Sequence, residues 1–401
     1  MGMDEKKGEQ LPIGALLALA MTGFICIVTE TLPAGLLPEI SVGLGISASM
    51  AGQMVTVYAL GSLLAAIPLT IATQGWRRRT VLLLTIVGFL VFNSVTALSS
   101  NYSVTLIARF FAGVSAGLAW SLIAGYARRM VVPQLQGRAL AIAMVGTPVA
   151  LSLGVPLGTW LGGFMGWRMA FGLMSGLTLV LIVWVLVKVP DYPGQSSAQR
   201  KSLRDVLFTP GVRSVLGVVF TWMLAHNILY TYVAPFVSEA GLAGDVDLVL
   251  LAFGVAALAG IWVTGRLVDR HLRKAVLASL ATFAAVAVFF GLFSGSALAI
   301  YVGVIIWGLT FGGAATLLQT ALADSAGEGA DVALSMNVVV WNSAIAGGGL
   351  LGGVLLGQYG VSSFPWALLT LLLLSLVIAS RARAHGFAQG ERQASQRVAG
   401  H

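Results

Sequence analysis

Glu30 and Arg109 are the residues of this sequence whose types and positions most clearly suggest chemistry, because each is the only side chain of its charge in the middle of an apolar stretch. A carboxylate or guanidinium inside a bilayer is costly and usually has a partner and a function. Measured by helical rise from the expected outer helix ends near Pro38 and Tyr102, both lie at a depth on the order of 11 Å. We therefore expect the two side chains to be able to pair.

Such a pair would handle protons. The proton affinity of a buried carboxylate depends on its desolvation and on its distance from a cation, so a movement that separates Glu30 from Arg109 would change proton occupancy. Two structural alternatives stay open. Glu30 could belong to a purely structural ion pair or lie at the outer rim, and Arg109 could staple its own helix to backbone carbonyls of the first span.

His226 is a third candidate for proton handling. It lies roughly 20 Å into its span by helical rise, near the midplane. An imidazole there could titrate or hydrogen-bond a substrate. A buried histidine whose hydrogen bonds are satisfied is the structural alternative.

Polar and aromatic side chains at mid-depth predict a substrate site. Amides and rings suit a neutral or polar organic molecule, whereas the small number of buried charges argues against a strongly anionic one. Asn337 and Trp341 are four residues apart and share a helix face. The candidate substrate-binding residues are Gln53, Tyr58, His226, Asn227, Tyr230, Gln319, Asn337, Trp341 and Asn342. Hydrogen bonding between helices is the alternative for each of them.

Small residues spaced four apart predict helices that touch closely. The pairs are Gly113 with Gly117, Gly154 with Gly158, and Gly348 with Gly352. Gly154 and Gly158 flank Pro156 in a span that also contains Pro148, and two prolines in one helix free backbone carbonyls and bend it. We expect a gating element at Gly154, Pro156 and Gly158, with simple packing as the alternative.

A second candidate gating element is the loop Gly265-Arg266-Leu267-Val268-Asp269-Arg270-His271-Leu272-Arg273. An acid among arginines at the membrane face can form charge-assisted bonds that latch neighbouring helices. Gly265, Asp269 and Arg270 are therefore expected to take part in gating. A solvated basic loop that only sets orientation is the alternative. The matching segment, Thr70 to Arg79, has no acid, so a latch in the first half should be weaker.

Composition makes this chain a polytopic membrane protein. Of its 401 residues, 58% are hydrophobic and 9% charged, against about 25% charged in soluble domains. The net charge of +8 comes from short basic clusters between apolar runs, which argues against a nucleic-acid partner. Cys26 is the only cysteine, so neither an intramolecular disulfide nor redox chemistry is expected. The first span is expected to serve as an uncleaved insertion signal.

Apolar stretches long enough to cross a bilayer predict an all-α integral membrane fold of twelve helices in two pseudo-symmetric six-helix bundles. The stretches are 11–38, 47–72, 80–99, 103–127, 138–161, 167–189, 212–238, 248–268, 275–294, 297–323, 331–357 and 364–381. The expected domains are an N-terminal bundle at 1–189, a cytoplasmic linker at 190–211, a C-terminal bundle at 212–382 and a cytoplasmic tail at 383–401.

The basic residues predict the orientation. With a cytoplasmic N-terminus, Arg168 is the one basic residue in the outer loops and Arg109 is buried, which leaves 21 of the 23 Lys and Arg residues inside. The positive-inside rule then places both termini in the cytoplasm. The clusters ending at Arg79 and Lys274 are 195 residues apart, which indicates parallel six-helix repeats, a transporter design. The same offset carries Glu30 to Ala225, beside His226.

These motifs resemble the major facilitator superfamily, and within it the bacterial sugar, drug and nucleoside efflux proteins of the twelve-helix drug:proton antiporter branch. The resemblance covers about residues 12 to 380. It rests on Thr29-Glu30-Thr31, Gly35-Leu36-Leu37-Pro38, Ala51-Gly52-Gln53, Val55-Thr56-Val57-Tyr58-Ala59, Arg109 to Gly117, Gly154-Val155-Pro156-Leu157-Gly158, Gly166-Trp167-Arg168 and Gly265 to Arg273.

The resemblance implies a proton-coupled efflux antiporter that exports a drug, sugar or nucleoside-like compound by alternating access, with Glu30 and Arg109 in the coupling positions. A proton-coupled importer, a uniporter and an integral-membrane enzyme are the competing interpretations. The enzyme interpretation is the weakest, because the sequence lacks the clustered His, Asp or Cys residues that an integral-membrane enzyme would need. The expected partners are a small-molecule substrate, protons and the lipid bilayer, with no cofactor, metal or nucleic acid. A monomer in the bacterial cytoplasmic membrane is expected.

Overall fold

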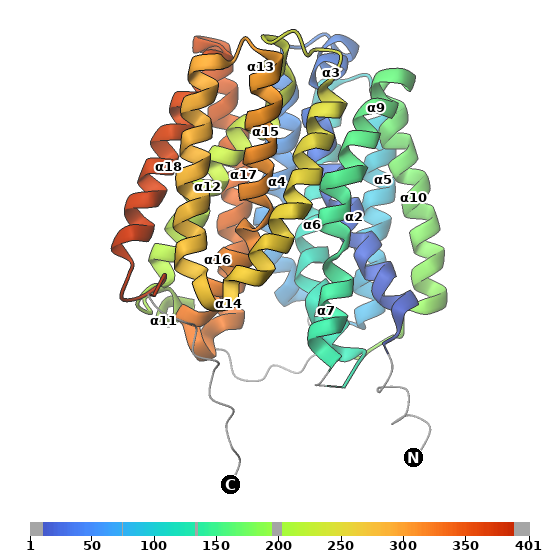
Figure 1. Ribbon diagram of the computed structural model, residues 1–401. Helices are drawn as coiled ribbons and strands as arrows, with labels where there is room; N and C mark the ends of the chain where they lie inside the picture. The colour runs from blue at the N-terminus through green and yellow to red at the C-terminus, as the bar shows by residue number, and fades with distance from the viewer. Residues whose placement is uncertain (1–10, 74, 133–134, 195–202, 389–401) are drawn as a thin grey trace, which may run out of the picture.

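A computed structural model describes residues 11–73, 75–132, 135–194 and 203–388, and this part of the chain is all-helical (Figure 1). The helices of the first half are α2 (Ile13–Gly35), α3 (Leu37–Leu44), α4 (Ala48–Ala72), α5 (Arg78–Leu98), α6 (Tyr102–Arg129), α7 (Gln136–Met144), α8 (Gly146–Val149), the π-helix η2 (Ala150–Gly154), α9 (Val155–Met165) and α10 (Trp167–Lys188).

The remaining helices are α11 (Leu203–Leu207), α12 (Val212–Thr231), α13 (Val233–Ser238), α14 (Val246–Phe293), α15 (Ala297–Gly312), α16 (Ala314–Ala326), η3 (Gly327–Gly329), α17 (Ala330–Tyr359), η4 (Val361–Ser363) and α18 (Phe364–Arg381). In Figure 1 the short helices α3 and α13 lie at one end of the bundle and α11 lies at the other, while α10 and α18 form opposite flanks. We call these the α3–α13 end and the α11 end.

Twelve helical segments of the described residues are long and apolar enough to span a membrane, as the sequence predicts. α14 supplies two of them, because the chain leaves helical geometry at His271. Several predicted boundaries differ from the structure by a few residues, and the seventh span differs most. It ends at Thr231 instead of 238, because Tyr232 is not helical and the chain restarts as α13.

The two halves repeat each other at the α3–α13 end. The first helix of each half stops at a residue of nearly identical geometry, Leu36 (φ −114°, ψ 20°) and Tyr232 (φ −113°, ψ 31°). A short helix follows, and then a glycine of positive φ, Gly45 (65°) or Gly241 (77°), where a side chain would be strained. Both pairs are 196 residues apart. The weak repeat seen in the sequence is thus a repeat of backbone structure.

Close helix contacts occur where the spaced glycines predict them. A Cβ on Gly113 would meet the carbonyl of Tyr58, and one on Gly117 would meet that of Ser62, so α4 and α6 pack backbone to backbone. In α17, a Cβ on Gly348 would meet Asn227 of α12. Such contacts require small residues.

The fifth span is irregular between its two prolines. The π-helical turn η2 follows Pro148 and ends before Pro156. A Cβ on Gly154 would meet Phe24, and one on Gly158 would meet Leu32, so both glycines face α2 of the same half. The predicted irregularity of this span is therefore present as a π-helical turn. The packing alternative explains these two glycines, and their predicted role in gating stays a prediction.

Contacts between the halves include a hydrogen-bonded group toward the α3–α13 end, formed by Ser49, Gln53, Tyr232, Gly349 and Gly353. The Gln53 amide donates to the Tyr232 hydroxyl and to the Gly349 carbonyl at 3.3 Å each, and the Tyr232 hydroxyl donates to the Gly349 carbonyl at 2.8 Å. The Ser49 hydroxyl donates to the Gly353 carbonyl at 3.0 Å. We call this group the cross-half latch, because it ties α4 to the region of α12 and α17.

Removing the Tyr232 hydroxyl should loosen this latch. In a Cys26→Ala background carrying Thr56→Cys, which lies on α4 against Gly349, we expect Tyr232→Phe to speed labelling by a membrane-impermeant maleimide applied from the α3–α13 end. Each lost bond is worth about 0.5–1.5 kcal/mol, so a roughly threefold to tenfold faster rate follows.

A matched control is available at the same end. The Tyr102 hydroxyl donates to the Met50 carbonyl at 2.7 Å, a bond that joins two helices of one half. Tyr102→Phe should leave the labelling rate unchanged. Equal rates in the Tyr232 variant and the parent would remove Tyr232 from the latch.

The segment after α10 straps the α11 end of the first half. Arg77 donates to the Asp191 carboxylate, whose other oxygen accepts from the Arg79 N–H at 3.2 Å. The Tyr126 hydroxyl donates to the Pro190 carbonyl at 2.6 Å. The sequence predicts a weaker first-half latch because Thr70 to Arg79 contains no acid. Asp191 of the linker supplies an acid to this segment, and the relative strength of the two latches stays a prediction.

The second half has a matching strap. Arg273 donates to the carbonyls of Ala379, Ser380 and Phe387 at 2.8–2.9 Å, and the Phe387 side chain is fully buried. Tyr192 and Phe387 are 195 residues apart. Of the tail predicted at 383–401, residues 383–388 are described and pack back onto the bundle, while 389–401 lie outside the described residues.

Asp191→Asn tests the first strap. Partial burial works to raise the pKa of the Asp191 carboxyl, but hydrogen bonds from Arg77 and the Arg79 N–H hold it below its ordinary value. Its stabilisation is therefore present above the unfolded pKa of about 3.9 and is lost as the pH falls through the lower folded value. We expect a loss of less than ~1 kcal/mol at pH 7, as for other exposed ion pairs, and a smaller loss as the pH falls below about 3.9.

The measurement is thermal unfolding of the detergent-solubilised protein across that pH range. Glu239→Gln, which changes an exposed acid just beyond α13, serves as the control and should behave as wild type. A difference between Asp191→Asn and wild type that grows as the pH falls would contradict the sign of this argument.

Candidate functional site

Arg109 of α6 is fully buried, and it joins three helices of the first half. Its Nε donates to the Met54 carbonyl of α4, and one terminal nitrogen donates to the Glu30 carbonyl of α2, each at 3.2 Å. The guanidinium lies 4.7 Å from the ring centroid of Tyr58 and 5.6 Å from that of Phe171. Two carbonyls and two aromatic faces thus hold the cation in place.

The predicted pairing of Arg109 with the Glu30 carboxylate is wrong for this structure. Both side chains are described and within electrostatic reach of each other, but no ion pair joins them; the backbone carbonyl of Glu30 takes the hydrogen bond instead. The alternative reading, in which Arg109 staples its helix to the first span, is the arrangement observed.

Tyr58 belongs to the same group. Its ring is fully buried, and its hydroxyl donates to the Cys26 carbonyl at 2.9 Å. The hydroxyl therefore already has an acceptor and the ring is covered by Arg109. The geometry gives Tyr58 a part in positioning Arg109, which differs from the substrate contact expected of it.

The Glu30 carboxylate lies where α2 meets the second half. Its residue is 7% exposed, and the preceding Thr29 accepts a hydrogen bond from Asn93 of α5 at 3.0 Å. From α12, the Tyr230 hydroxyl lies against the Thr31 side chain and within electrostatic reach of Glu30, although no hydrogen bond of full geometry reaches it. Tyr230, a predicted substrate residue, is thus a neighbour of the predicted proton-coupling acid.

His226 lies in a group of aromatic rings from α12, α14 and α15. The imidazole stacks on Phe311, with ring centroids 3.5 Å apart and planes within 5°. Tyr230 and Trp307 are each 5.2 Å away, and Phe253 is 5.9 Å away. Glu30 and His226 are 196 residues apart, the spacing of the repeated kinks, so they occupy equivalent places in the two halves. We call His226, Tyr230, Phe253, Trp307 and Phe311 the aromatic cluster.

The surroundings of His226 favour binding over proton transfer. Its Nδ1 is buried and has no hydrogen-bond partner, and the groups named above around the ring are aromatic, with no carboxylate among them. Its predicted part in proton coupling stays a prediction without a partner group in the described structure.

Other predicted substrate residues have contacts outside the aromatic cluster. Asn227 and Asn342 each donate to a carbonyl four residues earlier in their own helix, at 2.7 and 2.9 Å. Gln53 belongs to the cross-half latch, and Gln319 is exposed on α16.

Two further candidates lie on α17. Asn337 has a buried side-chain oxygen without a partner. Trp341 is half-buried and packs against Val55, Ala59 and Ile345 between the halves. Whether Asn337 or Trp341 touches substrate stays a prediction.

No contact among the described residues supports the predicted second-half gate at Gly265, Asp269 and Arg270. Gly265 and Arg270 are exposed, and a Cβ on Gly265 would meet nothing. The side chain of Asp269 lies outside the described part. The arginine of this loop that ties helices together is Arg273.

Sequence reasoning missed Trp307, Phe311 and Phe253 in the aromatic cluster and Tyr232 in the cross-half latch. A signal existed for one pair: Trp307 and Phe311 are four residues apart and share a face of α15. Nothing in the sequence indicates that this face meets His226, because that contact joins residues 85 apart (226 and 311).

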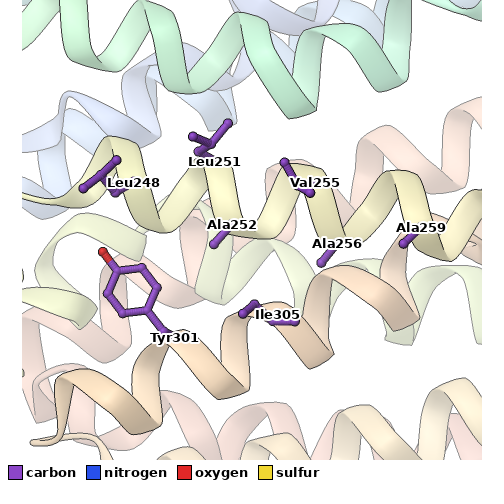
Figure 2. Close-up of a pocket in the computed structure, with 8 residues that line it drawn as sticks. All are labelled: Leu248, Leu251, Ala252, Val255, Ala256, Ala259, Tyr301 and Ile305. Carbon is purple, nitrogen blue, oxygen red and sulfur yellow. The ribbon is translucent and has the colours of Figure 1, made fainter.

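Figure 2 shows an apolar groove between α14 and α15, with a cavity volume of about 550 Å³. It is lined by Leu248, Leu251, Ala252, Val255, Ala256, Ala259, Tyr301 and Ile305. The Tyr301 hydroxyl is the one polar side-chain group among them, so the groove does not suit a polar organic molecule. None of the predicted site residues lines it.

Comparison with known proteins agrees with this architecture. The chain is 30% identical over 371 residues to the purine ribonucleoside efflux pump NepI of Escherichia coli O6:K15:H31 (strain 536 / UPEC), covering 91% of this chain and 92% of that protein. The same values hold for NepI of Shigella sonnei (strain Ss046). The crystal structure of the human organic anion transporter MFSD10 (TETRAN) matches with a TM-score of 0.65 and 17% identity, covering 94% of this chain and 100% of that chain.

The family model described as Major Facilitator Superfamily matches residues 19–349. This range includes Glu30, Arg109, the cross-half latch residues up to Gly349 and the whole aromatic cluster. Twelve spans, a structural neighbour that is a transporter and relatives that are efflux pumps all agree with that match. This chain belongs to the major facilitator superfamily of membrane transporters.

Proposed function

We propose that this protein is a proton-driven antiporter that exports a nucleoside-like compound across the bacterial cytoplasmic membrane. The observation that carries the proposal is the Glu30 carboxylate. This buried acid has no ion-pair partner among the described residues and lies where α2 meets Tyr230 of the second half. The substrate class comes from the relatives named purine ribonucleoside efflux pumps.

Glu30 is suited to carry the proton because its neighbours do not lock it in one charge state. The Arg109 guanidinium is held by the carbonyls of Glu30 and Met54, so it offers a fixed positive field instead of a bound partner. Protonation removes the attraction of the carboxylate to that field, whereas deprotonation restores it. The charge of Glu30 can therefore change without breaking the hydrogen bonds that hold α2, α4 and α6 together.

Alternating access then requires the halves to separate at the α3–α13 end. In this structure the cross-half latch closes that end. Tyr230 connects this movement to the acid, because separation of the halves would draw its hydroxyl away from Thr31 and Glu30. Proton binding at Glu30 and opening of the latch are thus expected to depend on each other.

We take the direction of transport, export, from the relatives named efflux pumps, and the orientation from the basic clusters. The basic clusters lie in loops at the α11 end, which the positive-inside rule places in the cytoplasm. The latch joins the halves at the opposite end, and we propose that this state receives substrate from the cytoplasm.

The test is transport of labelled adenosine, a purine ribonucleoside, into inverted membrane vesicles with and without a pH gradient, acid inside. We expect accumulation only with the gradient, and its collapse by a protonophore. Equilibration without accumulation in either case would indicate a uniporter. Loss of preloaded adenosine driven by the same gradient would indicate an importer. No adenosine transport at all would overturn the substrate class.

A further inference from the structure

The aromatic cluster gathers buried polar atoms that lack hydrogen bonds. Of the fourteen buried side-chain atoms without a partner among the described residues, three lie here: the His226 Nδ1, the Tyr230 hydroxyl and the Trp307 Nε1. Leaving a buried polar atom unpaired is unfavourable. Three of them on rings in mutual contact point to a molecule that pairs with them.

The shape of the cluster indicates what kind of molecule fits. The imidazole of His226 is a five-membered heterocycle lying face to face on Phe311, with planes 5° apart. Phe311 is half-buried, unlike Trp307 and Phe253, which are about 1% exposed. The rings around it present π faces and, at their edges, nitrogen and hydroxyl groups. This combination suits a flat heterocycle that stacks and forms hydrogen bonds in its own plane.

The position of the cluster suits a substrate that must cross between the halves. His226 is the counterpart of Glu30 in the structural repeat, and Tyr230 of the same helix reaches Thr31 of the first half. Phe311 lies at the end of α15, directly before the break at Gly313 that separates α15 from α16. The cluster is therefore at the face of the second half that meets α2.

Resting on the proposed function, we propose that this cluster is the binding site for the base of the exported nucleoside. The base stacks on Phe311 in the place now taken by the imidazole, and the displaced His226, with Trp307 and Tyr230, hydrogen-bonds the edges of the base. In the unloaded protein the imidazole occupies the stacking place. Stacking of a base on an aromatic side chain strengthens binding by roughly fivefold to a hundredfold.

Phe311→Leu tests the stacking step, because leucine keeps an apolar side chain and removes the ring. For adenosine transport by inverted vesicles we expect the KM to rise roughly tenfold or more, with the maximal rate at saturating adenosine little changed. Phe311→Tyr keeps the ring and should restore a KM near that of wild type. Phe290→Leu is the matched control: that ring is fully buried on α14 and contacts Phe236, outside the cluster.

Trp307→Phe tests the hydrogen-bonding step, because phenylalanine keeps a ring and removes the N–H donor. We expect a higher KM for adenosine here too. Unlabelled ribose, which has no base, should compete poorly with labelled adenosine in wild type and in every variant. Protein level and detergent stability are measured for each variant, so that a folding defect is recognised.

The outcomes separate the two proposals. Adenosine transport by wild type with an unchanged KM in both Phe311→Leu and Trp307→Phe would overturn the base site and leave the export function standing. Absence of adenosine transport and of adenosine binding in wild type would overturn both. An equal rise in KM in Phe290→Leu and Phe311→Leu would show a general packing effect and would also overturn the base site.

Discussion

Glu30→Gln will abolish gradient-driven export while leaving the protein folded and able to bind substrate. Glutamine keeps the volume and the backbone carbonyl that accepts from Arg109, but its amide cannot exchange a proton. The measurement is adenosine accumulation in inverted vesicles with an imposed pH gradient, where we expect the variant to fall to the level of vesicles that lack the protein. Downhill exchange of adenosine should persist.

Glu39→Gln provides a matched control. Glu39 is the acid nearest to Glu30 along the chain and lies on α3, at the α3–α13 end. Burial raises the pKa of the Glu39 carboxyl above its ordinary value, so it is the natural rival for the proton. We expect this variant to transport normally. If Glu39→Gln fails and Glu30→Gln accumulates adenosine as wild type does, the proton is carried at Glu39 and the proposed coupling site is wrong.

Arg109→Lys should be nearly as damaging as Arg109→Ala. The guanidinium spans two carbonyls on different helices and lies over the faces of Tyr58 and Phe171. A lysine ammonium is a point charge that cannot reproduce this planar fork and stacking. Each charge-assisted bond is worth about 1.5–3 kcal/mol, so the loss of one should lower stability by about 2 kcal/mol and strongly reduce transport. Thermal unfolding in detergent and the vesicle assay measure the two effects.

Arg168→Lys is the matched control. Arg168 also donates to two carbonyls, those of Ser99 and Gly43, and lies 4.3 Å from the Trp167 ring centroid, but it is partly exposed near the α3–α13 end. Water can replace its bonds, so we expect a small effect. Wild-type stability and transport in Arg109→Lys would mean that only the positive charge matters, and the stapling role would be withdrawn.

Much of the fold could be predicted from the sequence. Twelve spans follow from apolar runs of about 20 residues, because a bilayer excludes any unpaired backbone and only a helix satisfies its own hydrogen bonds. The spaced glycines indicated where α4 meets α6, and Pro148 and Pro156 indicated the irregular fifth span. These are local properties, which residue type and spacing are enough to determine.

Part of the candidate site could also be predicted from the sequence, and part could not. Glu30 and Arg109 could be found because a charge in an apolar run is rare and costly. What Arg109 binds could not be found, since a carboxylate and a backbone carbonyl are both acceptors and the choice depends on where α2, α4 and α6 place them. The acid that completes the first strap, Asp191, lies 114 residues from Arg77, beyond the reach of any loop motif.

The sequence by itself therefore determined that this protein spans a membrane twelve times, repeats itself, and buries one acid and one base in its first half. Only the tertiary structure decided that Arg109 binds carbonyls, that Gln53 and Tyr232 join the halves, and that His226 stacks on Phe311. The physical reason is that burial and helix formation depend on each segment's own composition and backbone. The partner of a buried polar group depends instead on which distant helices pack against it.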